Sequence, residues 1–134
     1  MFAENKLQSL LNTPAITNRL STFTVNSITY PMLLNGHVLP SEWGPQSSTI
    51  NYYLSQNVAG GLDYGDYVYY INCRAASEST SRTIASTVFN ALNRISRPDT
   101  GAVCLVMPTI PPADETDNYN TIIELRIRTN GGVA

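Results

Sequence analysis

The sequence predicts an α/β (α+β) fold: a mixed, largely antiparallel sheet of four to five strands, with a long helix and an N-terminal helix packed on one face. Residues 66–74 are mostly aromatic and β-branched, the types that suit a strand. The following segment is helical, because its apolar residues recur at spacings of four, four and three, at Ile84, Val88, Leu92 and Ile95. Residues 119–129 alternate between apolar and polar types, as a half-buried strand does.

The length of 134 residues suits a single domain that spans residues 1–134. Three segments rich in proline or glycine interrupt the strand and helix patterns. We expect these segments to be extended loops or arms, at 31–48, 58–65 and 108–117.

The chain is expected to begin with a helix over residues 3–12. Leu7, Leu10 and Leu11 share one helical face. Pro14 ends this helix, since the residue before a proline is disfavoured in the helical conformation. Residues 23–30 then alternate roughly, which predicts one short strand that Pro31 closes.

Segment 31–48 carries three prolines and two glycines, yet it is too apolar for a solvated loop and includes Trp43. A structureless segment of this length is usually functional or bound to a partner. Two interpretations remain open. The segment folds back over the sheet and closes the core, or it is an arm that packs on a neighbouring subunit.

Two strands, at 49–57 and 66–74, are predicted to be antiparallel neighbours joined by a glycine-rich loop. This loop does not fit a phosphate-binding loop, because no lysine and no helix start follow its glycines. Tyr53 and Tyr70 occupy alternating positions that can face outward. Exposed tyrosines suit a partner contact, and the alternative is a second face covered by the chain's own arm.

The long helix is expected at about 77–96. A turn at 98–101 leads to a strand at 102–107 that is apolar on both faces, as in the interior of a sheet. The last strand, at 119–129, has one apolar face and one mixed, charged face. We expect the mixed face to meet water or a partner.

Charged residues make up only 13% of the chain, whereas about 25% is typical of soluble domains. The polar residues are mostly neutral, with 12 serines, 14 threonines and 13 asparagines. This is either a habit of composition or a sign that faces are buried against other subunits, because charge is depleted at interface cores. A net charge of -2 and a pI near 5.2 argue against a surface that binds a nucleic-acid backbone.

No catalytic or metal site is predicted, no cofactor is expected, and we expect the chain not to be an enzyme. His37 is the single histidine and stands apart from any nucleophile motif. Asp63 and Asp66 lack the further oxygen ligands of a calcium loop. Cys73 and Cys104 sit in apolar strand patterns and are expected to be buried, reduced thiols.

The arginines are scattered rather than clustered. Such side chains often bridge to carboxylates within or between subunits. Their long polar reach on a weakly charged surface leads us to expect that they contribute more to subunit contacts than to the core. The predicted subunit-interface residues are Trp43, Tyr53, Tyr70, Arg74, Arg82, Arg126 and Arg128.

A strand that ends in Cys73-Arg74 leads directly into a helix of the form Ser-Glu-x-x-Ser-x-x-Ile-Ala-x-x-Val-x-x-Ala-Leu, from Ser77 to Leu92. An N-terminal helix, an apolar loop with Pro and Trp, and a strand with a Tyr-Tyr pair precede it. This order resembles the small tail terminator, or tail completion, proteins of tailed bacteriophages. The resemblance covers about residues 3–129 and is a pattern of residue types.

The resemblance implies a mixed sheet with helices on one side and a structural role in the tail and neck of a virion. Members form a hexameric ring that caps the tail tube, stops its growth and meets the head. The implied partners are other copies of this chain, the tail tube protein on one side and a head-neck connector protein on the other. DNA would pass through the ring without specific binding. No membrane span or signal peptide is visible, so synthesis is expected in the host cytoplasm.

Two alternatives remain open. The first is another head-tail connector or baseplate subunit, which would differ in the neighbours that its ring touches. The second is a small ligand-binding or enzymatic α/β domain, which would show a deep polar pocket with a perturbed titratable group.

Overall fold

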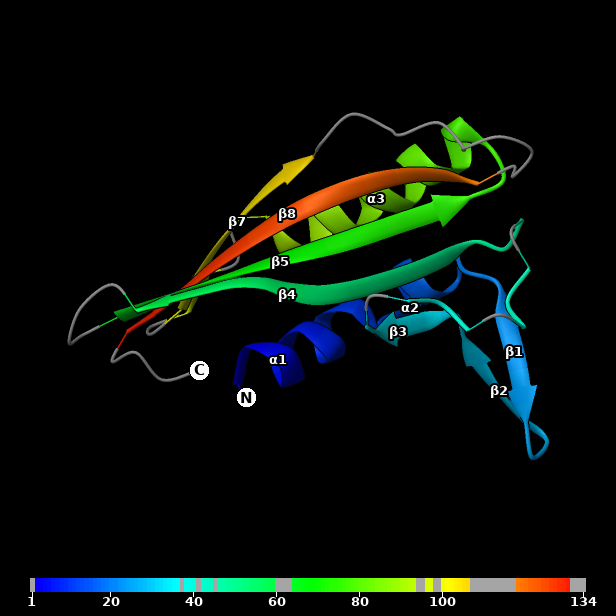
Figure 1. Cartoon of the computed structure of the whole chain (residues 1–134), viewed down its shortest axis with the longest axis horizontal. Coiled ribbons are helices and arrows are strands. Elements are labelled where there is room, and N and C mark those ends of the chain that lie inside the picture. Colours follow the sequence, from blue (N-terminus) through cyan, green and yellow to red (C-terminus); the bar gives the residue numbers. More distant parts are fainter. Residues whose placement is uncertain are drawn as a thin grey trace.

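A computed structural model of the chain confirms the α/β fold, with helices on one face of a mixed, largely antiparallel sheet (Figure 1). The model describes the backbone of residues 2–36, 38–40, 42–44, 46–59, 64–93, 96–97, 100–106 and 118–130. Side chains are described at 7–36, 38–40, 42–44, 46–55, 67–93 and 118–127.

Six strands of the described residues form the main sheet, in the order β3-β4-β5-β8-β7-β6. Among these described strands, only β3 and β4 pair in parallel. The sheet exceeds the expected four to five strands because two short strands, β3 and β6, extend its edges. The bounds are β3 (Leu33–Asn35), β4 (Thr49–Ala59), β5 (Tyr64–Ala75), β6 (Ser96–Arg97), β7 (Thr100–Val106) and β8 (Tyr119–Asn130).

The predicted antiparallel pairing of the two tyrosine-rich strands is confirmed. Tyr53 of β4 lies opposite Tyr70 of β5, and β5 in turn pairs antiparallel with β8 along its whole length. Because β4 runs to Ala59 and β5 begins at Tyr64, both strands extend into the expected loop at 58–65. Residues 60–63 and the expected loop at 108–117 lie outside the described residues.

The two predicted helices are present as α1 (Phe2–Leu11) and α3 (Glu78–Leu92). Ser77 caps α3, since its Oγ accepts a hydrogen bond from the backbone N–H of Thr80 at 3.2 Å. The helix ends at Leu92 rather than near 96, because the next residue turns to an extended conformation. Pro14 opens a further short helix, α2 (Pro14–Thr17), where its missing N–H needs no partner.

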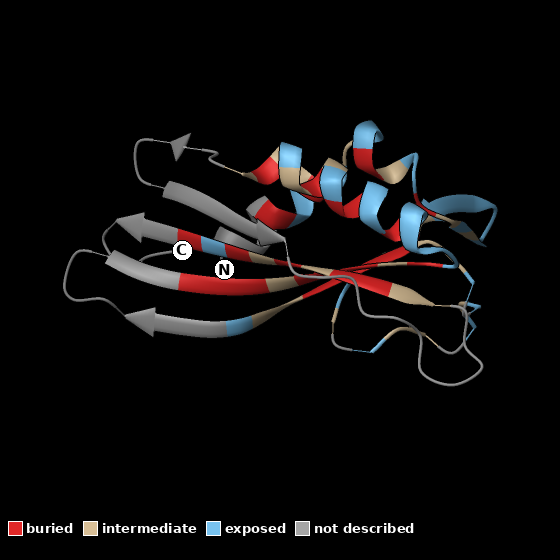
Figure 2. Ribbon diagram, turned by 90° about the horizontal axis from the view of Figure 1, so that it is seen from above, coloured by how far each residue is buried: buried red, intermediate tan, exposed pale blue. Residues whose placement is uncertain are grey.

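The core lies between the helices and one face of the sheet, as Figure 2 shows. In β5 and β8 every second side chain is buried on this face, which is the alternation expected of strands. The predicted apolar stripe of α3 packs against them through Ile84, Val88 and Leu92. The N-terminal helix contributes Leu7 and Leu11, so both predicted helices cover the same face.

One polar contact joins α3 to the sheet inside the core. Ser81 is fully buried, and its Oγ donates a hydrogen bond to the carbonyl oxygen of Cys73 at 2.7 Å. The Thr121 hydroxyl lies 2.8 Å from the same Oγ and donates to it, because the Ser81 proton is already used. This contact sets the position of the helix along β5 and β8.

Residues 23–30, predicted as one strand, form a hairpin instead. It consists of β1 (Thr22–Val25) and β2 (Ile28–Pro31), which pair only with each other in the described part of the chain. Asn26 and Ser27 form the turn with positive φ angles of 51° and 67°. Such two-residue turns match the twist of a hairpin. The turn interrupts the alternation of apolar and polar residues at one point only, so the sequence pattern predicts one continuous strand.

Part of segment 31–48 pairs with the sheet. It contains β3, whose three residues pair with the edge of β4, and Met32 accepts a hydrogen bond from Ile50 N at 3.0 Å. The stretch from Met32 to Gly36 therefore folds back on the sheet. This agrees with the interpretation that the segment folds back over the sheet, rather than with an arm that packs on a neighbouring subunit. Pairing between residues 17 positions apart has no local signal, so the sequence predicted no strand here.

Candidate subunit interface

The face of the sheet opposite the helices is the candidate interface. No helix of the described residues covers it, and in Figure 1 this face lies in front of α3. Strand alternation sends every second side chain of β4, β5 and β8 to it. We call it the open face. Its described members are the buried residues Thr49, Asn51, Val68, Asn72 and Asn120 and the more exposed residues Tyr53, Tyr70, Arg74, Ile122, Glu124 and Arg126.

Tyr53 and Tyr70 lie at the middle of the open face, as the sequence predicted from their outward positions. Their ring centroids are 6.0 Å apart with an angle of 80° between the rings, an edge-to-face arrangement. Both side chains are half-buried. Each ring therefore leaves part of its apolar surface available to a partner.

Arg74 lies farther along β5 and is also half-buried. Its guanidinium makes two long contacts with neutral groups, 3.4 Å to the Asn51 side-chain oxygen and 3.5 Å to that of Asn118. Burial lowers the pKa of Arg74, and electrostatic interaction with Tyr53 acts in the opposite direction. No described carboxylate forms an ion pair with it, although a partly desolvated arginine is stabilised by one.

Three asparagines on neighbouring strands surround Arg74 on this face. Asn51, Asn72 and Asn120 are buried, and the Asn120 amide donates a hydrogen bond to the Asn72 side-chain oxygen at 2.8 Å. The side-chain oxygen of Asn120, which pairs across the strands with Arg74, has no hydrogen-bond partner among the described residues. This amide cluster could not be predicted from the sequence, because its members come from three strands.

The other predicted arginines do not join Arg74. Arg82 lies on the exposed side of α3 and forms an ion pair with Glu78 one turn earlier, at 2.7 Å. Arg126 is exposed on the open face, opposite Val68 of β5. Arg128 lies two residues farther along β8, so the register places it on the same face, and its side chain is outside the described residues.

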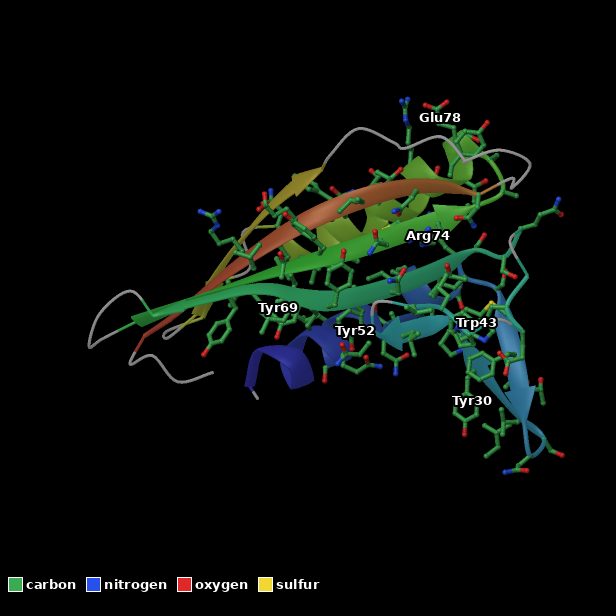
Figure 3. All side chains as sticks on the ribbon, viewed as in Figure 1. Tyr30, Trp43, Tyr52, Tyr69, Arg74 and Glu78 are labelled. Atoms are coloured by element: carbon green, nitrogen blue, oxygen red, sulfur yellow. The ribbon has the colours of Figure 1, made fainter. Side chains whose placement is uncertain are left out.

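Trp43 is remote from the open face and packs at the β1–β2 hairpin. Its ring lies 5.3 Å from that of Phe23, which in turn stacks on Tyr30 at 5.6 Å between centroids. Figure 1 shows the hairpin projecting from one end of the sheet, and Figure 3 places Tyr30 and Trp43 beside each other along it. We call β1, β2 and the residues Glu42 and Trp43 the arm.

One side of the arm is apolar. In the register, Phe23 pairs with Tyr30 and Val25 with Ile28, so these four side chains share a face, while threonines occupy the other. Val25, Ile28 and Tyr30 are 49%, 53% and 42% exposed. This apolar surface was not predicted from the sequence, because residues 23–30 were expected to form one strand. The signal for a hairpin is the pair Asn26-Ser27, which has two apolar positions on each side.

The described residues hold no group of three or more metal-ligating side chains. Burial raises the pKa of the Cys73 thiol well above its usual value, which fits the predicted buried thiol. His37 and Asp63 lie outside the described residues, and so do the side chains of Asp66 and Cys104. Among the helices that the structure describes, none is long and apolar enough to cross a membrane.

Comparison with solved structures shows a partial likeness of chain path. No family model matches the sequence, and no curated protein does. A chain in the solved structure of the virion of a native gene transfer agent (GTA) particle aligns with 93% of this chain and 84% of its own length. The sequence identity is 14% and the TM-score is 0.44, so the likeness is partial.

Proposed function

We propose that this chain is a structural protein of a virion: a tail terminator that forms a ring, caps the tail tube and joins it to the head-neck region. It acts by shape and contact rather than by catalysis. The resemblance in sequence over about residues 3–129 supports the class of protein. The observed arrangement of helices on one side of a mixed sheet agrees with what that class implies.

The observation that carries the proposal is the open face. It presents half-buried tyrosines and an arginine that no described carboxylate neutralises, beside buried amides, and it also carries Glu124 and Arg126. Tyrosine and arginine are enriched at protein interfaces. A subunit that contacts its neighbours through such a face needs no other chemistry.

The proposal includes three sets of partners: other copies of this chain in a sixfold ring, the tail tube protein on one side and a head-neck connector protein on the other. DNA passes through the ring without specific binding, which agrees with a net charge of -2. The chain is made in the host cytoplasm and becomes part of the virion.

The test is to measure the mass of the purified protein by native mass spectrometry and light scattering, alone and with tail tubes of the phage that encodes it. We expect a sixfold ring, either in solution or only on tube ends, where electron microscopy would locate it. A ring that binds the connector or the baseplate but not tube ends would favour the second candidate, another head-tail connector or baseplate subunit. A stable monomer that ignores tubes, connector and baseplate alike would refute a structural role in the particle.

A further inference from the structure

We propose that the arm of one copy docks on the open face of the next copy, with Glu42 of the arm paired to Arg74 of that face. This inference rests on the proposed function, because it names the contact through which copies of the chain assemble. It depends on two surfaces that lie on different parts of the same chain, each with a charged side chain that forms no ion pair with a described residue.

The first surface is the apolar side of the arm. Its side chains at Val25, Ile28 and Tyr30 are about half exposed, and Phe23 joins Tyr30 to Trp43 in a row of three rings. An isolated two-stranded hairpin is only marginally stable in water. Burial of these side chains against a second protein surface would stabilise both the hairpin and the assembly.

The second surface is the part of the open face around the tyrosine pair. Tyr53 and Tyr70 are half-buried, and Ile122 of β8 lies on the same face and is also half-buried. Aromatic rings on one side and exposed aliphatic side chains on the other are suited to pack against each other. Glu124 and Arg126, two residues apart on β8, place opposite charges beside this patch.

The charges of the two surfaces are complementary. The sequence contains no Asp, Glu, Lys or Arg between Leu20 and Ser41, so Glu42 is the single formal charge of the arm. Glu42 is exposed and forms no ion pair with a described residue, and Arg74 likewise forms none. A carboxylate that approaches Arg74 would replace its two long amide contacts with a charge-assisted hydrogen bond.

The arm is better placed to contact the open face of a second copy than the open face of its own chain. The described hydrogen bonds of the arm to the body are at its root, where Ser21 donates to Ser48 and accepts from Met32. The arm projects away from the sheet rather than across it (Figure 1). A contact between two different surfaces of identical copies is head-to-tail, and such contacts close into rings when the rotation allows.

The apolar part of the contact is tested by placing one charge on either side of the hairpin. Ile28→Asp puts a carboxylate on the apolar side, whereas Thr29→Asp puts the same group on the threonine side of the same strand. We expect Ile28→Asp to weaken ring formation at least tenfold by light scattering or native mass spectrometry. Thr29→Asp should stay within about twofold of the unmodified chain.

The ion pair is tested by mixing two variants. Glu42→Arg and Arg74→Glu should each weaken assembly by itself, because like charges then meet in every contact. An equimolar mixture should assemble again, since each contact between the two variants brings together one Arg and one Glu. Native mass spectrometry should then find even-numbered rings with equal numbers of both chains. Glu78→Gln, which removes an exposed charge already paired within α3 and outside both surfaces, is the control and should assemble normally.

Four results would overturn the inference. Ile28→Asp could assemble as Thr29→Asp does, or the mixture could fail to assemble although both variants keep their circular dichroism spectrum. A chain that carries both Glu42→Arg and Arg74→Glu could assemble while the mixture of the two single variants does not. That result would mean that Glu42 and Arg74 pair within one chain. Loss of tube binding with intact rings would assign the arm to the tube protein. The proposed function stands in all four cases. It gives way to the second candidate if rings of the unmodified chain bind the connector or baseplate but not tube ends, and a structural role fails if the unmodified chain is a monomer that binds none of them.

Discussion

At the scale of single residues, polar groups inside the fold decide how the helix layer sits on the sheet. Ser81 is the clearest case, because it is the one buried polar residue of α3 and contacts two strands at once. Its hydroxyl satisfies the Cys73 carbonyl and the Thr121 hydroxyl in a place that water does not reach. Buried polar groups that lose a partner cost more free energy than the hydrogen bond itself contributes.

Replacement of Ser81 by alanine should therefore lower the free energy of unfolding by about 1–3 kcal/mol. The change removes one hydroxyl and leaves the Thr121 hydroxyl with one contact fewer in the core. Urea unfolding monitored by circular dichroism is the measurement. Ser86→Ala, on the exposed side of the same helix, is the control and should change stability by less than about 0.5 kcal/mol. Equal effects of the two substitutions would contradict the structural role of Ser81.

At the scale of elements, the hairpin depends on its turn. Asn26 and Ser27 both have positive φ, a conformation that asparagine tolerates and serine adopts with strain. Glycine adopts this conformation without strain, which explains the preference for Asn-Gly in such turns. The chain thus holds its arm with a turn that is less stable than it could be.

Ser27→Gly is expected to stabilise the hairpin by about 0.5–1 kcal/mol, because the strain at φ 67° disappears. Amide hydrogen exchange of the β1 and β2 residues is the measurement, since the hairpin is a separate two-stranded sheet. Protection factors there should rise about two- to fivefold, with no change in β5 or β8. Ser27→Ala keeps the Cβ and should give no increase; a gain with alanine as large as with glycine would show that strain at this residue is not the cause.

At the scale of the whole molecule, the low content of charge shapes how copies can associate. Charged residues amount to 13% of the chain; the arm carries one, Glu42, and the open face carries Arg74, Glu124 and Arg126 among its described members. Contacts between such surfaces gain mainly from burial of apolar and aromatic area, with the charges serving to select orientation. Salt screens exposed charges at a distance of about 8 Å under physiological conditions, whereas it does not weaken apolar burial.

The assembly should therefore keep its mass when sodium chloride is raised from about 0.1 M to about 1 M, where the screening length falls to about 3 Å. Light scattering at several protein concentrations gives the dissociation constant at each salt level. We expect a change of less than about fivefold. Dissociation into monomers at high salt would mean that ion pairs, rather than the arm and the tyrosine pair, hold the copies together.

Much of the fold follows from local patterns in the sequence. The alternation in β5 and β8 indicated which residues face the core, and the spacing of Ile84, Val88 and Leu92 indicated the buried side of α3. These predictions hold because the periodicity of a strand or helix reports directly on which side is buried. The outward positions of Tyr53 and Tyr70 were determined in the same way.

Other features were decided only by the tertiary structure. The parallel pairing of β3, the contact of the Tyr53 ring with Tyr70 and the lack of a described carboxylate near Arg74 all depend on residues distant in sequence. The sequence showed that arginines were available, but it could not show that Arg82 is neutralised within α3 whereas Arg74 meets neutral amides. Residue patterns determine which face of each element is buried, and only the packing of distant elements determines which groups are left without a partner.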